Sequence, residues 1–555
     1  MVRTRRVKGR FPMQHHGQHR VFGVVGCLAA CIGLMSACSS SKKSASAPAG
    51  TAAAGTATTA AGTPKKGGTL VVGEYNPLTS LDPAKVPFNA EVAAEDLAAI
   101  YGVLIRYNPS TNKYEPSMAQ SLTPNADFTA WTLKLRPNVQ FTDGTPFDAA
   151  AVVTNIKRHL NPAVHSVAAG DLALIADMAT PDNMTVVFTL KQPWAGFQYA
   201  LVRAGLVAAP SYLAQLDAGN TSAQPIGAGP FKLQSFRAGE EVTLVRNDSY
   251  WDGAPYLDGV QFVYIAGGAA TLQAFQTGQT QVAYIHDPAT AAQVVKDNIA
   301  HFTNHIDLGT VLMFNNRAKG ANGSGSIMSD VRLREAVSEG IDPTVINDRV
   351  YQDTAFTTSN LFPPTSMWQD PSIPGITYNP NHAKQLVAQV KAETGWDGTV
   401  RFLYQTSPDS AALPVALEAL LGPLGFKVQL VPDSTSAQLL NDVKVKQDYD
   451  IASWGFAFSD PVPFSTLYEN FYSTSISNVP GYKNPDMDAA LDTLRVAATT
   501  TETKAALAKV QQVWNTTYPS LDLNAVNELV LNKANVHGLN FTLFSVPLLD
   551  KAWLS

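Results

Sequence analysis

The chain has 555 residues, of which 45% are hydrophobic and 15% charged, so it can bury a large core in at least two domains and is neither disordered nor fibrous. Only one stretch, near the N-terminus, is long and apolar enough to meet a membrane, which excludes a polytopic membrane protein. Six of the 40 Lys and Arg and none of the 45 Asp and Glu lie in residues 1–37, so the remainder has a formal charge of −11. An acidic body disfavours nucleic acid as a partner.

The N-terminus is typical of a secretory signal. Basic residues from Arg3 to Arg20 precede an uncharged apolar run from Val21 to Ala37, and small residues precede Cys38. All three cysteines lie in or directly after this run, so a chain beginning at Cys38 has no internal disulfide. The stretch 34–38 resembles a bacterial lipobox, which implies that Cys38 is lipidated. An ordinary membrane anchor or a conventionally cleaved signal is the alternative.

A flexible tether is predicted after Cys38. Residues 39–66 are almost entirely Ser, Ala, Gly, Thr, Pro and Lys, without an aromatic or large aliphatic residue, so they cannot bury enough surface to fold. A flexible coil of this length spans roughly 30 Å, which would hold a globular body clear of a membrane.

The first ordered part of the chain is predicted to combine strands with a helix. Residues 68–73 form a short apolar run after glycines, typical of a buried strand, and residues 131–135 alternate apolar and polar side chains. Asp148 fits the N-cap of a helix that continues through Leu160. Further strands are predicted over 231–244 and 260–264.

From about residue 330 the pattern changes to alternating helices and strands, as in an α/β lobe. Asn379 and Pro380 predict the start of a helix that ends at Gly395. The predicted series continues with a strand over 400–404, a helix over 411–424, a strand over 426–431, a helix near 439–445 and a strand over 451–453.

Several short blocks recur in a family-like order over nearly all of the chain after the tether. They are 67–70 followed by 81–83, 101–104 followed by 114–116 and Leu122, 133–139, 141–147, 227–231, 246–251, and 334–337 leading to 341–343. Each block alone is weak evidence for a family. The ordered series, however, resembles the extracellular solute-binding proteins of family 5, the peptide and nickel class of ABC-importer receptors. Residues 338–340 and Pro343 depart from the family pattern.

The resemblance implies an α/β fold with mixed α+β parts, in which two lobes close on a ligand and the first lobe contains an extra inserted domain. The hinge would consist of strands around 308–316 and 520–531. The predicted boundaries are 1–37 for the signal peptide, 38–66 for the lipidated Cys and tether, 67–98, 221–307 and 521–555 for lobe I, 99–220 for the inserted domain, and 308–520 for lobe II.

The resemblance also implies a function: a non-enzymatic receptor that captures a small ligand and delivers it to the permease and ATPase subunits of an importer. Oligopeptides are the leading ligand class, with a non-peptide solute as the alternative. No cofactor is expected. The protein would be exported as a monomer and anchored by lipid to the outer face of the cytoplasmic membrane.

Enzyme and metal-binding alternatives find less support. The sequence contains no Gly-x-Ser-x-Gly, His-Glu-x-x-His or P-loop motif, although a secreted hydrolase with a carboxylate pair stays open without geometry. Residues 227–230 predict a turn that enters a strand rather than a phosphate cradle. His301 and His305 could bind a metal on one helix face, but their segment is predicted to be extended, which disfavours this.

The predicted ligand-binding residues follow strands, where α/β sheets place their ligand loops. Trp454, Phe456 and Asp460 follow the strand over 451–453, with core aromatics as the alternative for Trp454 and Phe456. Peptide-binding relatives place an Asp that pairs with the ligand's α-ammonium three residues after the Trp, and this sequence has Ala457 there. The remaining predicted ligand-binding residues are Tyr404, Gln405, Tyr75 and Asn76.

Overall fold

The computed structural model describes residues 62–555 except 321–322, 324, 355–357, 407–410, 434–435, 457, 459 and 462. The described residues all fall within one compact unit, residues 53–555. The predicted signal, Cys38 and most of the predicted tether lie outside the described residues. Among the helices that are described, none has the length and apolar character needed to cross a membrane.

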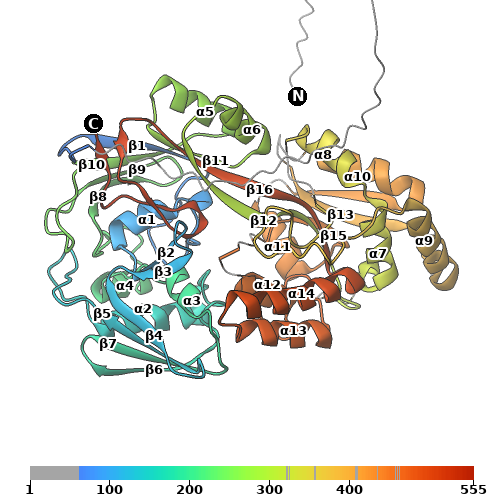
Figure 1. Cartoon of the computed structure of the whole chain (residues 1–555), viewed down its shortest axis with the longest axis horizontal. Helices are drawn as coiled ribbons and strands as arrows, with labels where there is room; N and C mark the ends of the chain where they lie inside the picture. The colour runs from blue at the N-terminus through green and yellow to red at the C-terminus, as the bar shows by residue number, and fades with distance from the viewer. Residues whose placement is uncertain are drawn as a thin grey trace, which may run out of the picture. The chain divides into compact units, whose positions relative to one another are not determined.

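A ten-stranded mixed sheet forms the centre of the unit, in the order β14-β13-β15-β12-β16-β11-β1-β10-β9-β8 (Figure 1). Its strands are β1 (Thr69–Glu74), β8 (Phe231–Arg237), β9 (Glu241–Arg246), β10 (Gly259–Tyr264), β11 (Val282–Ile285), β12 (His301–Phe314), β13 (Thr399–Gln405), β14 (Lys427–Asp433), β15 (Ile451–Trp454) and β16 (Ser520–Asn532). The strands predicted at 68–73, 231–244, 260–264, 400–404, 426–431 and 451–453 are confirmed to within a few residues.

Two long antiparallel strands, β12 and β16, connect the two halves of this sheet. Strand β11 pairs with the end of β16, with Ile285 opposite Leu529, whereas β15 pairs with the end of β12, with Trp454 opposite Val311. Because β1 and β11 run opposite to β13 and β15, the carboxyl ends of the two sets of strands face one another. Residues 522–529 of β16 separate these ends by roughly 23 Å at ~3.3 Å per residue.

The pairing of β12 with β16 is irregular at its centre. The register shifts between Ile306 and Thr310, and the Thr310 backbone N–H donates to Asn524 Oδ1 at 2.7 Å. A Cβ on Gly309 would lie 2.4 Å from Val526 Cγ2, so only glycine allows the two strands to approach this closely. The bulge therefore lies between the two facing sets of strand ends, inside the segment predicted as the hinge.

A smaller antiparallel sheet, in the order β4-β5-β7-β6, lies apart from the central sheet. Its strands are β4 (Ala119–Pro124), β5 (Ala130–Leu135), β6 (Ile175–Asp182) and β7 (Thr185–Leu190), and a separate hairpin consists of β2 (Ile105–Asn108) and β3 (Lys113–Pro116). Trp131, Leu133 and Leu135 are buried on one face of β5, as the alternation predicts. Short strands near the C-terminus are β17 (Val536–His537), β18 (Asn540–Phe541), β19 (Pro547–Leu548) and β20 (Trp553–Leu554).

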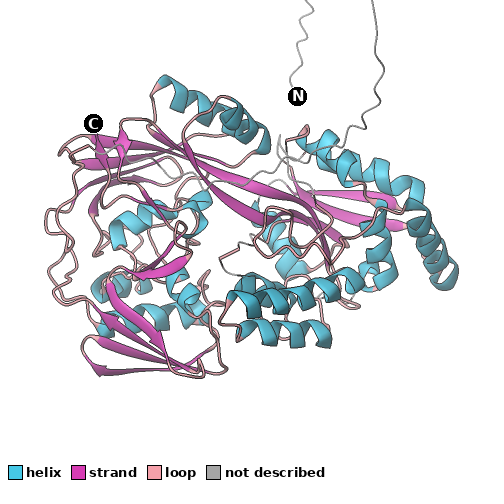
Figure 2. Ribbon diagram, viewed as in Figure 1, coloured by secondary structure: helices cyan, strands magenta, loops and turns pink. Residues whose placement is uncertain are grey.

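Helices cover the sheets (Figure 2). In the first half they are α1 (Ala94–Tyr101), α2 (Ala149–Leu160), α3 (Gln198–Arg203), α4 (Pro210–Asp217), α5 (Gly268–Thr277) and α6 (Pro288–Lys296). Helices α5 and α6 pack on β11 and β16 (Figure 1). Asp148 caps α2 by accepting from the Ala151 backbone N–H at 2.9 Å, which confirms the predicted start of that helix.

The second half contains most of the longer helices. They are α7 (Val331–Gly340), α8 (Pro343–Tyr351), α9 (Pro380–Thr394), α10 (Ala412–Leu421), α11 (Ser436–Asn441), α12 (Pro463–Phe471), α13 (Pro485–Arg495) and α14 (Thr500–Thr517). The predicted helix starting at Pro380 is confirmed, with Asn379 as its N-cap and Gly395 in the left-handed conformation at its end. The helix predicted near 439–445 continues from α11 as a π-helix over Asp442–Lys446.

Candidate ligand-binding site

A cavity of about 440 Å³ lies among segments that are distant in sequence. We call it the aromatic cavity, because its wall includes Tyr107, Tyr114, Phe128, Trp131, Trp194, Trp368 and Phe464. One side comes from residues between 107 and 198, and the other from residues between 367 and 503. Indole and phenyl rings offer large rigid contact areas at low entropic cost, which suits an apolar or aromatic ligand.

Asp460 lies in the wall of the aromatic cavity and holds a neighbouring loop in place. Its Oδ1 accepts from Ser366 Oγ at 2.5 Å, and its Oδ2 accepts from the Met367 backbone N–H at 2.8 Å. Its carbonyl oxygen accepts from Trp368 Nε1 at 2.8 Å. These bonds position the Trp368 ring, so Asp460 has a structural role at this wall.

The opposite wall carries tyrosines whose hydroxyls stay protonated. Tyr107 donates from its hydroxyl to Asn112 Oδ1 at 2.8 Å. Burial raises the pKa of Tyr107, and the negative charge of Asp460 raises it further. Burial likewise raises the pKa of Tyr114. Both phenols are therefore neutral hydrogen-bonding groups rather than anions at any physiological pH.

Arg495 supplies a cation in the cavity wall, and its two Nη atoms are engaged, whereas its Nε has no hydrogen-bond partner among the described residues. Its Nη2 donates to Asp492 Oδ1 at 3.0 Å, and its Nη1 donates to the Pro193 carbonyl oxygen. The residue is 8% exposed. With Arg495 and Asp460 both bonded within the protein, the wall offers a ligand mainly aromatic and neutral polar contacts.

Trp454, Tyr404 and Gln405 lie where β15 and β13 end. Trp454 is half-buried at the end of β15, and Tyr404 stacks on Phe402 with ring centroids 5.5 Å apart. Gln405 pairs in register with Asp433 of β14. The three residues therefore lie at the carboxyl ends of neighbouring parallel strands.

Phe456 belongs to the core. It is 7% exposed, and its ring meets Phe471 edge-on at 5.1 Å between centroids. Its backbone N–H donates to the Leu308 carbonyl oxygen at 3.2 Å, which fixes the segment after β15 against β12. The packing of Phe456 therefore supports the alternative that it is a core aromatic.

Tyr75 and Asn76 lie at the facing set of strand ends, directly after β1. The Tyr75 ring lies 6.0 Å from that of Tyr284 and 5.5 Å from that of His286, between centroids. Asn76 Nδ2 donates to the Glu91 carbonyl oxygen at 3.0 Å. Tyr75 and Trp454 thus mark opposite sides of the central part of β12 and β16.

Comparison with known proteins decides the family. Residues 113–478, more than half of the chain, match the family model described as "Bacterial extracellular solute-binding proteins, family 5 Middle". The chain belongs to this family. The family comprises binding proteins rather than enzymes.

Curated relatives and solved structures agree with this assignment. The probable D,D-dipeptide-binding periplasmic protein of Escherichia coli is 26% identical over 457 residues, which is 78% of this chain and 84% of that protein. The Bacillus subtilis oligopeptide-binding protein in complex with a nonapeptide has a TM-score of 0.74 at 21% identity, covering 89% of this chain and 100% of the other. A Helicobacter pylori periplasmic binding protein in complex with a peptide has a TM-score of 0.72 at 24% identity, covering 88% and 98%. The predicted two-lobed α/β fold is confirmed.

The predicted site residues of this solute-binding protein do not all converge. Asp460 lines the aromatic cavity, whereas Trp454, Phe456, Tyr404, Gln405, Tyr75 and Asn76 do not. Three cavity residues, Trp131, Trp194 and Trp368, could not be predicted as site residues. An aromatic residue in a strand or loop looks the same in sequence whether it fills a core or lines a cavity. Ligand binding by the seven predicted residues stays a prediction.

A cluster of buried carboxyls beside Tyr75 was also missed. Glu74 ends β1, and Glu95 and Asp96 lie in the first turn of α1; each is at most 2% exposed. Glu74 Oε1 and Glu95 Oε2 have no hydrogen-bond partner among the described residues. Burial raises the pKa of Glu74 to about 8, although hydrogen bonding with Asp96 partly opposes this, and burial also raises the pKa of Glu95 and Asp96. Glu74 is therefore mainly protonated at neutral pH.

The histidine pair is extended, as predicted. His301 and His305 both lie in β12, so they are separated by roughly 13 Å along the strand. One metal ion cannot bind both side chains at this spacing, because zinc–nitrogen bonds are about 2 Å long. The turn predicted at 227–230 is likewise confirmed, since β8 begins at Phe231.

Proposed function

We propose that this protein is the solute-binding receptor of an ABC importer and that it captures one oligopeptide per chain. The facing strand ends on either side of β12 and β16 are the main structural support, because a ligand placed between them contacts both halves of the sheet. The names of similar proteins support an oligopeptide as the ligand, since these proteins are described as dipeptide-, peptide- and oligopeptide-binding proteins. The receptor delivers its ligand to permease and ATPase subunits.

Closure follows from the position of the ligand. A ligand that contacts both lobes binds the closed state more tightly than the open state, so it shifts the population toward closure. We propose the predicted domain boundaries for this movement, with lobe I at 67–98, 221–307 and 521–555, the inserted domain at 99–220, and lobe II at 308–520. Strands β12 and β16 pass between the lobes, and the bulge at Gly309 is a natural position for the hinge.

Aromatic stacking and neutral hydrogen bonds, rather than an ion pair, hold the ligand in this proposal. A buried ammonium needs a paired carboxylate, since burying an unpaired charge costs several kcal/mol. The residue three positions after Trp454 is alanine, and both oxygens of Asp460 already accept hydrogen bonds. Glu74, whose pKa burial raises to about 8, is mainly protonated at neutral pH and therefore provides little negative charge.

Matched peptides test this mode of binding. N-acetylated and free forms of one oligopeptide are expected to differ in affinity by less than about tenfold, or ~1.4 kcal/mol. Calorimetry with each peptide gives both the stoichiometry, expected to be one per chain, and the affinity ratio. A hundredfold preference for the free amine that Asp460→Asn abolishes would show that Asp460 anchors the ligand. Turnover of the peptide would contradict the receptor function itself.

Export and anchoring complete the proposal. We propose that residues 1–37 are removed, that Cys38 carries diacylglycerol, and that the tether over residues 39–66 links the monomer to the outer face of the cytoplasmic membrane. Two acyl chains hold a protein at a membrane, whereas one chain does so only marginally.

Cys38→Ala is expected to release the protein from the membrane fraction and to prevent lipid modification. Detergent partition and intact mass of the wild type and the variant measure both effects. Cys31→Ala is the matched control, because Cys31 lies in the segment that is removed and its loss should leave anchoring intact. A wild-type protein without lipid mass, or one that retains residues 1–37, would contradict the proposal.

A further inference from the structure

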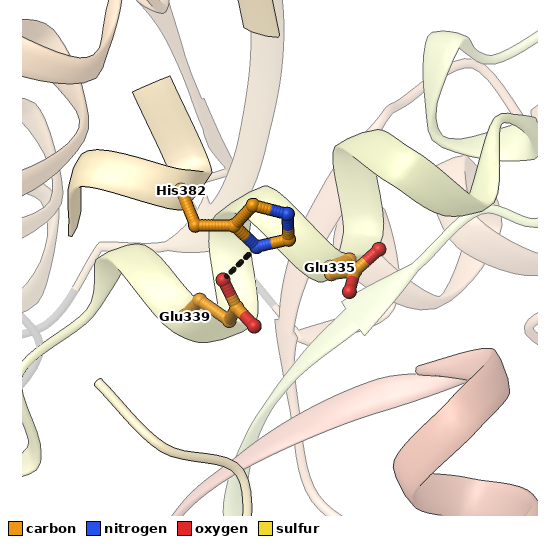
Figure 3. A group of neighbouring side chains, drawn as sticks. All are labelled: Glu335, Glu339 and His382. Atoms are coloured by element: carbon orange, nitrogen blue, oxygen red, sulfur yellow. Dashed lines mark hydrogen bonds and ion pairs between the residues drawn. The ribbon is translucent and has the colours of Figure 1, made fainter. Parts of the chain in front are cut away.

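Three metal-ligating side chains converge on one surface, away from the aromatic cavity and the facing strand ends. Glu335 and Glu339 belong to α7, and His382 belongs to the first turn of α9 (Figure 3). One ligand atom from each residue lies within 4.8 Å of the other two. The group combines an imidazole with two carboxylates on two helices, so it differs from a run of surface acids.

The backbone fixes the relative position of these residues. Glu335 and Glu339 are four residues apart and share one face of α7. The Asn379 backbone N–H donates to the Glu339 carbonyl oxygen at 2.8 Å, and Asn379 Oδ1 accepts from the His382 backbone N–H at 3.2 Å. The N-cap of α9 is therefore bonded to the last turn of α7. His382 Nδ1 already lies 2.7 Å from Glu339 Oε2.

In the described part of the chain, His382 is the one cationic partner of these two carboxylates, through its ion pair with Glu339. Among the described residues, neither Glu335 nor Glu339 forms an ion pair with a lysine or arginine. The nearby Arg332 pairs with Asp330 and Glu393, and Arg334 donates to backbone carbonyl oxygens. Two carboxylates at this helical spacing repel one another, so the site favours a bound cation independently of its ligand geometry.

The site is open to an ion from solvent. The His382 side chain is 41% exposed and the Glu339 side chain 15% exposed. On the inner side, the Tyr518 hydroxyl donates to Glu335 Oε1 at 3.3 Å and orients this carboxylate. Tetrahedral ligands at 2.0–2.2 Å from zinc are about 3.3 Å apart. Atoms at 4.8 Å must therefore approach by roughly 1.5 Å, whereas His382 Nδ1 and Glu339 Oε2, at 2.7 Å, must separate slightly. Rotation of exposed side chains can supply a movement of this size.

We propose that Glu335, Glu339 and His382 form a binding site for one divalent transition-metal ion, with zinc as the best match. Zinc accepts imidazole nitrogen and carboxylate oxygen together, whereas magnesium and calcium prefer oxygen ligands alone. Three protein ligands leave one position for water, so the site is of the open type. Tyr518 lies two residues before β16, and the ion would therefore connect α7 and α9 next to a strand that joins the two halves of the sheet.

Calorimetric titration of the purified chain with zinc chloride tests the proposal. We expect one zinc ion per chain and weaker binding, by about tenfold or more, in Glu339→Gln and in His382→Ala. Glu418→Gln is the matched control, since Glu418 is an exposed carboxylate on α10 of the same half and should leave zinc binding unchanged. Thermal unfolding without metal checks that each variant remains folded, and the zinc-dependent rise in melting temperature should disappear only in the site variants.

Three results would overturn the proposal. The first is the absence of zinc binding up to about 1 mM, an affinity too weak for a built site. The second is stoichiometric binding that both site variants retain, which would place the ion elsewhere. The third is equal affinity for calcium and zinc, which would contradict the proposed role of the imidazole. X-ray absorption at the zinc edge supplies a direct readout, because imidazole and carboxylate ligands give different outer-shell scattering.

Discussion

Glu74→Gln is expected to remove the contribution of Glu74 to a loss of stability that occurs as the pH rises from about 5 to about 8, while Glu95 and Asp96 keep their own contributions. Burial raises the pKa of Glu74 from 4.5 to about 8. The folded state then retains a proton that the unfolded state releases, so the stabilisation is complete below about pH 4.5 and is lost as the pH rises through about 8. Glutamine keeps the shape of the protonated acid but cannot ionise.

The expected size of this effect is roughly 3 kcal/mol between pH 5 and pH 8, because each pKa unit corresponds to about 1.4 kcal/mol. Urea unfolding of the wild type and the variant at both pH values gives the difference. Glu240→Gln is the control, since Glu240 is an exposed carboxylate on the surface. The same pH dependence in the wild type and Glu74→Gln would mean that Glu74 is ionised in the folded protein.

Trp454→Ala is expected to weaken ligand binding by about tenfold to a hundredfold, and by more than Asp460→Asn does. In the proposed binding mode the half-buried indole at the end of β15 stacks on the ligand, and loss of such a contact costs about 1–3 kcal/mol. Asp460 instead bonds Ser366 and Met367 in the cavity wall. Its replacement should mainly lower the melting temperature.

Calorimetry with the same peptide for wild type and both variants separates these effects. Phe456→Leu is a useful comparison, because Phe456 packs on Phe471 in the core and its shortening should reduce stability more than affinity. If Asp460→Asn abolished binding while Trp454→Ala bound normally, the ligand would lie in the aromatic cavity against Asp460 rather than at the end of β15.

Local signals in the sequence predict the elements of this fold well. Asn379, Pro380 and Gly395 define α9 because capping chemistry depends on a few adjacent residues. The alternation of apolar and polar residues defines β5, because Trp131, Leu133 and Leu135 on one face of the strand are buried. The long strands β12 and β16 are predicted only through the resemblance to family 5. Their buried polar residues hide the alternation of apolar and polar residues that usually indicates a strand.

The site could be predicted only in part, because its geometry depends on contacts between distant segments. Ser366 and Asp460 are 94 residues apart, and no pattern near either residue indicates their hydrogen bond. Phe456 and Trp454 lie in the same short segment, yet one is buried and the other half-buried. Periodicity gives the direction of a side chain relative to its own strand, but not whether a protein core or a cavity lies there.

The carboxyl cluster illustrates the same limit for electrostatics. A glutamate at the end of a strand and two acids in the first turn of a helix are ordinary in sequence, and the latter suit the helix dipole. Only the folded chain buries Glu74, Glu95 and Asp96 together. Their raised pKa values follow from this burial, which the sequence does not reveal.

Native mass spectrometry of the untreated protein tests the central claim most directly. If the protein is a receptor that closes on one oligopeptide, the spectrum should show each chain with at most one bound small molecule, and fragmentation should release intact peptides. Added peptide should convert the ligand-free chain to the same one-to-one complex. A chain that stays ligand-free with every added peptide, or that releases cleaved products, would contradict the account.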